Sequence, residues 1–254
     1  MTRLEELIRN TKAKPLLGVA CYRPDAAFVE IAGKLGFHIV WIEMEHAHIS
    51  FGEAADLCRV AAGVGLATMI RIPDARRENV LRAAECGPDI IDLPMANSPE
   101  ILEEFVSHAR YAPEGNRGFF GASRAVGYGL GGDIAEEQRR INESLCLMGQ
   151  IETREAVEQA EALCAVKGVN AILLGLGDLS SSLGVVGATG HPAVRQAAEK
   201  VIGIAKRHGR IVVVAGAPAD AAMWAQKGVD VLFCASDIMC LRTGAQSILD
   251  QTRG

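Results

Sequence analysis

Eight short apolar runs recur along the 254-residue chain, and a stretch with the spacing of a helix follows each of them. The runs lack the alternation of apolar and polar residues that marks a half-exposed strand, and this is typical of parallel strands buried on both faces. Glycine and proline bound them. They cover residues 15–20, 39–43, 67–73, 90–93, 146–151, 171–174, 211–214 and 231–233. Eight strand–helix units favour a closed barrel over an open doubly wound sheet.

The predicted fold class is therefore α/β, as a single (β/α)8 barrel of the TIM type over residues 1–254. The length suits one such barrel, and no break in composition marks a second domain. Two glycine-rich stretches without periodicity, 112–132 and 180–190, are predicted to be loops. Loops of this length in a compact domain tend to be functional.

Charge and hydropathy narrow the possible partners. A net charge of −5 gives no basic field for nucleic acid or an anionic membrane. Residues 1–8 form a charged amphipathic pattern, and no run approaches the roughly 18 apolar residues of a membrane span. The seven cysteines include no CxxC pair, which is typical of free thiols in a reducing compartment. We expect a cytoplasmic protein that acts on small molecules, with no nucleic-acid or membrane partner.

Charged side chains gather where the predicted strands end, and in such barrels the loops after these ends build the site. The set comprises Glu43, Glu45, His46, His48, Arg71, Glu152 and Asp178. A guanidinium, carboxylates and imidazoles together make a poor surface for packing alone. They suit a hydrated divalent ion such as Mg²⁺ or Mn²⁺ with an anionic substrate.

Each of these residues also has a structural interpretation. Glu152 and Asp178 are compatible with helix caps or first-turn acids, and singly that interpretation is the favoured one. Arg71 is compatible with a structural ion pair, or with stabilisation of a carboxylate or an enolate. His46 is either a loop residue or a base near neutral pH, which one of the two preceding glutamates would orient. Their joint placement favours a site. His48 remains a loop residue in this interpretation.

Five segments, taken in order, resemble the HpcH/HpaI aldolase family. They are WIEMEHA at 41–47, MIRIP at 69–73, RYAPEGNRG at 110–118, QIET at 150–153 and GLGDL at 175–179. The resemblance spans nearly the whole chain. It implies a class II pyruvate aldolase of the phosphoenolpyruvate/pyruvate barrel superfamily, which uses a divalent metal (Mg²⁺, Mn²⁺ or Co²⁺) and takes a 2-oxo acid and an aldehyde. It also implies a homo-oligomer, a hexamer in relatives, whose C-terminal helix is often exchanged between subunits. Here the segment 238–249 would either serve that exchange or cover its own barrel.

The resemblance implies roles for individual residues. Glu152 and Asp178 would bind the metal, Arg71 would contact the keto oxygen of pyruvate and stabilise its enolate, and His46 would act as the base. The remaining substrate-binding positions would be Gln150, Gly177 and Asp178, the last two through their backbone N–H groups.

Three positions depart from the family pattern. Glu43 stands where many members carry the aspartate that pairs with the histidine. Glu85 stands where a neighbouring subunit usually lends an aspartate to the site. Each is longer by one methylene, so reach and base strength would differ. Leu176 replaces the proline that usually follows the glycine of the carboxylate-binding turn.

The function expected from these features is the cleavage or formation of a 4-hydroxy-2-oxo acid through a pyruvate enolate, giving pyruvate and an aldehyde. One alternative keeps the site and changes the reaction, as an oxaloacetate decarboxylase or another metal-enolate lyase. A second alternative is a non-catalytic barrel that binds a metabolite, against which the retention of Arg71 and His46 with the two metal-binding acids argues. No lysine follows a predicted strand, which argues against a Schiff-base aldolase.

Overall fold

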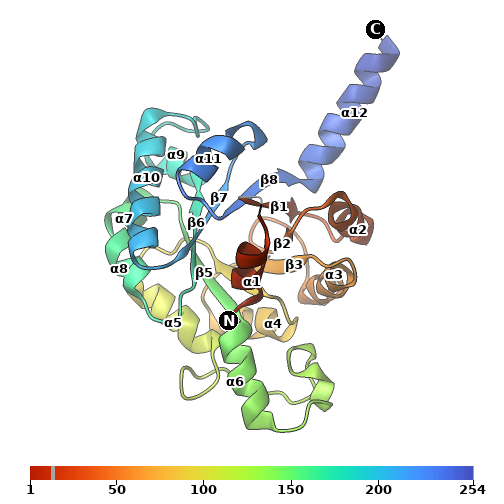
Figure 1. Cartoon of the computed structure of the whole chain (residues 1–254), viewed down its shortest axis with the longest axis vertical. Coiled ribbons are helices and arrows are strands. Elements are labelled where there is room, and N and C mark those ends of the chain that lie inside the picture. Colours follow the sequence, from red (N-terminus) through yellow and green to blue (C-terminus); the bar gives the residue numbers. More distant parts are fainter. Residues whose placement is uncertain (13–14, 254) are drawn as a thin grey trace.

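The computed structural model describes residues 1–12 and 15–253, and its eight parallel strands close into one barrel (Figure 1). Each strand pairs with the next along the chain, and β8 pairs with β1 to complete the ring. The strands are β1 (Leu16–Cys21), β2 (Ile39–Glu43), β3 (Ala67–Arg71), β4 (Ile90–Leu93), β5 (Cys146–Ile151), β6 (Ala171–Gly175), β7 (Ile211–Ala215) and β8 (Val231–Ser236). The predicted (β/α)8 barrel is confirmed.

Helices alternate with the strands and cover the outside of the barrel (Figure 1). The α-helices are α1 (Arg3–Asn10), α2 (Ala26–Leu35), α3 (Phe51–Gly63), α4 (Arg77–Glu85), α5 (Pro99–Ala109), α6 (Ile134–Ser144), α7 (Arg154–Glu158), α8 (Ala160–Ala165), α9 (Leu176–Ser182), α10 (Pro192–Arg207), α11 (Ala221–Gln226) and α12 (Asp237–Arg253). Two 3₁₀ turns, η1 (Arg124–Gly129) and η2 (Pro218–Asp220), lie in the connections.

Local sequence signals fix several helix starts. Ser50 caps α3 in a capping box that is visible in the sequence: its hydroxyl accepts from the N–H of Glu53, whose carboxylate accepts in return from the N–H of Ser50 at 2.7 Å. The main difference from prediction is α9, which includes residues 180–182 of the stretch 180–190 that was expected to be a loop. Leu176 and Leu179 lie three residues apart and are buried, so one apolar face holds this short turn of helix against the core.

The inside of the barrel is a packed core. It is formed by side chains at alternate strand positions, among them Leu16, Ile39, Trp41, Met69, Ile90, Met148, Leu173, Val213 and Phe233. The rings of Trp41 and Phe233 meet edge to face, with centroids 5.2 Å apart. A Cβ at Gly18 would lie 2.4 Å from the Phe233 ring, so only glycine leaves room for this ring.

α12 projects away from the strands after β8, as Figure 1 shows. All seven cysteines are free thiols, in agreement with the expectation from their spacing. Across residues 1–12 and 15–253, no helix combines the length and apolar character needed to span a membrane.

Candidate active site

Three charged side chains stand side by side at the C-terminal end of the barrel. Glu43 ends β2, Arg71 ends β3, and Asp92 lies near the end of β4; in the sheet, Arg71 is the register partner of both acids. Residues two apart on a strand share a face, so each stands above a side chain of the barrel core: Trp41, Met69 and Ile90. All three charged residues are buried.

Arg71 is held in place by two glutamates from the end of β2. Its Nε donates to Glu43 Oε2 at 2.7 Å, and its Nη1 lies 3.1 Å from Glu45 Oε2. The guanidinium also stacks over the Trp41 ring, 4.8 Å from the centroid. Burial acts to lower the pKa of Arg71, but its attraction to Glu43 raises it, and the net shift is upward. The group is a fixed cation whose remaining N–H groups can face a bound anion.

Glu43 is not the partner of the His46 ring. Its Oε1 accepts the backbone N–H groups of Glu45 and His46, at 2.7 and 3.0 Å, and its other oxygen accepts from Arg71. The acid that faces the imidazole is Glu45, whose Oε2 lies 3.6 Å from His46 Nε2. The extra methylene of Glu43 thus serves to pin the loop after β2 and Arg71 together, while the imidazole remains exposed.

Glu152 and Gln150 bound the site at the end of β5. Glu152 is only 2% exposed; its Oε1 accepts the Met95 N–H at 2.8 Å, and its Oε2 accepts from Gln150 Nε2. Burial raises the pKa of Glu152 to about 7, and the negative charge of Asp178 adds to this shift. A Cβ at Gly175 would lie 2.5 Å from Glu152 Oε2, so glycine is needed where β6 passes this carboxylate.

The residues present fit a divalent cation. The negative charge of Asp178 contributes to the raised pKa of Glu152, and a cation between the two carboxylates would relieve that repulsion. Within the described residues, no cluster of three or more His, Cys, Asp or Glu side chains is arranged to hold a metal. The chain would supply two carboxylate ligands, and water or substrate would fill the other coordination positions of the metal, which suits Mg²⁺ or Mn²⁺.

The other predicted positions lie around this pair. Gly177 and Asp178 are exposed in the first turn of α9, where Leu176 turns its side chain into the core in place of the family's proline. His48 is exposed in the loop between β2 and α3, as its interpretation as a loop residue requires.

Sequence reasoning missed Asp92. It is fully buried, and among the described residues neither of its carboxylate oxygens has a hydrogen-bond partner. Burial raises the pKa of Asp92 well above its ordinary value, although the positive charge of Arg71 opposes this shift. The available signal in the sequence is a single aspartate inside the apolar run 90–93.

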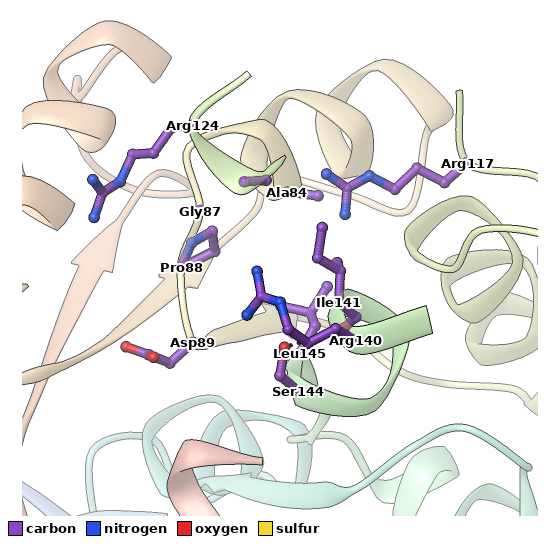
Figure 2. Close-up of a pocket in the computed structure, with 11 residues that line it drawn as sticks. Ala84, Gly87, Pro88, Asp89, Arg117, Arg124, Arg140, Ile141, Ser144 and Leu145 are labelled. Atoms are coloured by element: carbon purple, nitrogen blue, oxygen red, sulfur yellow. Dashed lines mark hydrogen bonds between the residues drawn. The ribbon is translucent and has the colours of Figure 1, made fainter. Parts of the chain in front are cut away.

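Glu85 lies at the opposite end of the barrel. It is the last residue of α4, which starts after the C-terminal end of β3 and returns to the start of β4. There it pairs with Arg117 at 2.8 Å, and its Oε2 is buried without a partner among residues 1–12 and 15–253. Arg117, Arg140 and Ala84 line a cavity of about 270 Å³. Figure 2 shows the residues around this cavity, with the guanidinium of Arg117 beside Ala84. Two guanidinium groups there pair with acids, Arg117 with Glu85 and Arg140 with Glu137, whereas Arg124 donates to the Cys86 carbonyl at 3.1 Å.

Comparison with known proteins identifies the family of the chain. The family model described as HpcH/HpaI aldolase/citrate lyase matches residues 22–243. A 5-keto-4-deoxy-D-glucarate aldolase of Escherichia coli is 28% identical over 222 residues, which cover 87% of this chain and 86% of that protein.

Two solved structures extend the comparison. The HpcH/HpaI aldolase from Desulfitobacterium hafniense DCB-2 is 29% identical and superimposes with a TM-score of 0.92, over 100% of this chain and 97% of that one. A citrate lyase beta subunit from M. tuberculosis, complexed with oxaloacetate and magnesium, shares the fold at 15% identity, with a TM-score of 0.57 over 90% and 93% of the two chains. The chain belongs to the HpcH/HpaI aldolase/citrate lyase family and is an enzyme of the aldolase or lyase type.

Proposed function

We propose that the protein is a divalent-metal-dependent class II pyruvate aldolase. It would cleave or form a 4-hydroxy-2-oxo acid, with pyruvate and an aldehyde as the products of cleavage. The observation that carries this proposal is the fixed guanidinium of Arg71, held by Glu43 and Glu45 at the same barrel end as the carboxylate pair Glu152 and Asp178. A 2-oxo acid presents a keto oxygen and a carboxylate, which match a cation and a bidentate donor.

Glu152 and Asp178 would hold the metal, which supplies Lewis acidity at the keto oxygen when bound. Arg71 would donate N–H groups to the same oxygen as negative charge develops on it. Since Arg71 is already oriented by two carboxylates, little reorganisation accompanies that step. The backbone N–H groups of Gly177 and Asp178 would hold the substrate carboxylate.

His46 would exchange the proton of the substrate 4-hydroxyl. In the cleavage direction it would take this proton as the C3–C4 bond breaks, the electron pair of that bond would pass to the enolate, and protonation of C3 would give pyruvate. Its imidazole is exposed at the mouth of the site, with Glu45 at 3.6 Å to orient it. Gln150, which donates to Glu152, would position that carboxylate rather than react.

A panel of aldehydes incubated with pyruvate and Mn²⁺ tests this function, with adducts identified by mass spectrometry. Adduct formation that EDTA abolishes and Glu152→Gln eliminates is the expected result. Turnover that persists in EDTA, or full activity of Glu152→Gln, would refute the metal mechanism. Exposed Glu103→Gln on α5 is the matched control, because it makes the same chemical change outside the site.

Oxaloacetate decarboxylation is the second candidate, because it passes through the same enolate and needs the same residues. The observation that favours this second reaction is that the fold-related citrate lyase beta subunit is complexed with oxaloacetate and magnesium. Incubation with oxaloacetate distinguishes the two reactions. Pyruvate release from oxaloacetate without any aldehyde adduct would make the protein a decarboxylase.

We also propose that the protein works as a homo-oligomer, a hexamer by resemblance, in which α12 packs on or is exchanged with a second copy. α12 carries Ile238, Leu241 and Ile248 at 49%, 53% and 63% exposure, which is high for large apolar residues. Light scattering of the intact protein and of Leu241→Glu tests this proposal. A monomeric wild type, or an unchanged mass for Leu241→Glu, would contradict it.

Glu85 would act only in such an assembly, since it lies at the far end of its own barrel. Its unpartnered Oε2 would then face the site of a neighbouring copy. Mixing inactive His46→Gln with inactive Glu85→Gln chains should restore activity, because some sites would receive both intact residues. Failure of the mixed oligomer to regain activity would refute this role.

A further inference from the structure

Met95 has a backbone conformation that side chains rarely adopt. Its φ is +51°, and within residues 1–12 and 15–253 the only other non-glycine residue with positive φ is Tyr128. A left-handed conformation is unfavourable for a residue with a Cβ, and it persists only where the surroundings impose it. Met95 is the second residue after β4, at the barrel end that carries the candidate active site.

The surroundings that impose this conformation are hydrogen bonds to β5 and the residues after it. The N–H of Ala96 donates to the Gln150 carbonyl at 3.0 Å. Asn97 receives two more hydrogen bonds, from the Thr153 hydroxyl to its side-chain oxygen at 2.7 Å and from the Gln159 amide to its carbonyl at 2.8 Å. The segment 95–97 is thus fastened to the strand that delivers the candidate metal ligand.

The strained residue makes one bond of its own to that ligand. Its N–H donates to Glu152 Oε1 at 2.8 Å, while Gln150 occupies the other carboxylate oxygen. The two donors fix the plane of a carboxylate that is 2% exposed, and each oxygen keeps a lone pair for a cation. Because Ala96 and Asn97 are held by β5 and the residues after it, turning φ of Met95 to a negative value would rotate its N–H relative to these anchors and away from Glu152. The Met95 side chain is 46% exposed and is not needed for this bond.

We infer that Met95 is a positioning residue for the metal, and that its left-handed backbone serves to aim its N–H at Glu152. This inference rests on the proposed metal-dependent function. It makes a distinctive prediction: the residue at position 95 matters through the conformation it permits, and hardly through its side chain. Residues that tolerate positive φ should preserve metal binding, and residues that oppose it should weaken metal binding.

The test compares Met95→Gly and Met95→Asn, which tolerate positive φ, with Met95→Ile, whose branched Cβ opposes it. Mn²⁺ affinity is read from the free-Mn²⁺ signal in electron paramagnetic resonance, with and without pyruvate. The glycine and asparagine variants should bind as wild type does. The isoleucine variant should bind about tenfold more weakly or worse, the usual effect of losing a partner that orients a ligand.

Tyr128→Ile is the matched control, since it opposes the same backbone conformation in η1, on the connection between α5 and α6. It should leave Mn²⁺ affinity unchanged. Equal affinities for Met95→Ile and wild type, or an equal loss in the glycine variant, would overturn the inference. Should Met95→Ile fail to fold by circular dichroism, Met95→Ala replaces it with the same expected direction. If the wild type itself binds no Mn²⁺, or Glu152→Gln binds it equally well, the proposed function fails instead.

Discussion

Replacing Glu152 with glutamine should remove a pH dependence from the stability of the metal-free protein. In the folded chain, burial raises the pKa of this carboxyl from an ordinary 4.5 to about 7. Between these two values the folded protein holds a proton that the unfolded chain has released. The folded state therefore binds more protons in this window, and the free energy of unfolding falls as the pH rises through it.

The magnitude follows from the size of the shift. Each pKa unit corresponds to about 1.4 kcal/mol, so a move from 4.5 to about 7 amounts to about 3 kcal/mol of stability lost by pH 8. Asp92 and Glu45 are also shifted upward, mainly by burial, and contribute in the same direction. The difference between the wild-type and Glu152→Gln curves isolates the contribution of Glu152, because the other two acids are present in both proteins.

Urea unfolding of both proteins at several pH values from 4.5 to 8, in EDTA, measures this difference. As the pH rises from 4.5 to 8, the free energy of unfolding of Glu152→Gln should increase steadily relative to that of the wild type. The exposed control Glu103→Gln should show the same pH dependence as the wild type. Saturating Mn²⁺ should recover stability for the wild type above pH 7 and have no such effect on the variant, since a ligand must be deprotonated to bind.

The reasoning would be refuted if the free energies of unfolding of wild type and Glu152→Gln changed in parallel with pH. They would mean that the Glu152 carboxyl is already ionised across the window, so that its burial and the nearby Asp178 do not disfavour its charge. The case for a cation between these two acids would then lose its electrostatic basis.

Three further predictions concern neighbouring positions. Arg71→Lys should lower kcat about 100-fold or more, because a lysine lacks the planar fork that meets a developing enolate; an unchanged kcat would exclude this role. Gly175→Ala should weaken Mn²⁺ binding about tenfold, because the added Cβ would lie 2.5 Å from Glu152 Oε2. Gly177→Ala should leave Mn²⁺ binding unchanged, because no described atom lies within 4 Å of its added Cβ. Asp92→Leu should stabilise the metal-free protein by about 1–3 kcal/mol in urea unfolding, since it removes a buried carboxyl without a partner; destabilisation would show that the carboxyl has one.

The barrel could be predicted because its determinants are local. A run such as 39–43 is short, apolar and followed by a polar loop, and Ser50 with Glu53 marks the next helix start without any tertiary information. α9 was missed for the opposite reason. Its sequence begins with two glycines around Leu176, and only burial against the neighbouring helices makes a helical turn favourable there.

The candidate site was predictable as far as strand ends define it. Arg71 and Glu152 were identified because the last residue of a parallel strand, or the residue after it, reaches the same end of the barrel in every unit. Which acid meets which base depends on side-chain reach, which a sequence does not give. Glu43 therefore turned out to orient Arg71 and the loop, and Glu45 to face His46.

The roles of Met95 and Glu85 could not be predicted from the sequence, because neighbours distant in sequence decide them. Met95 is an ordinary apolar residue by composition, and only bonds from segment 95–97 to β5 and the residues after it force its backbone to direct an N–H at Glu152. Glu85 is an ordinary helix acid, and only the return of α4 to the far end of the barrel shows that it cannot serve its own site. Any catalytic role for Glu85 therefore requires a second copy of the chain, and activity should then depend on assembly.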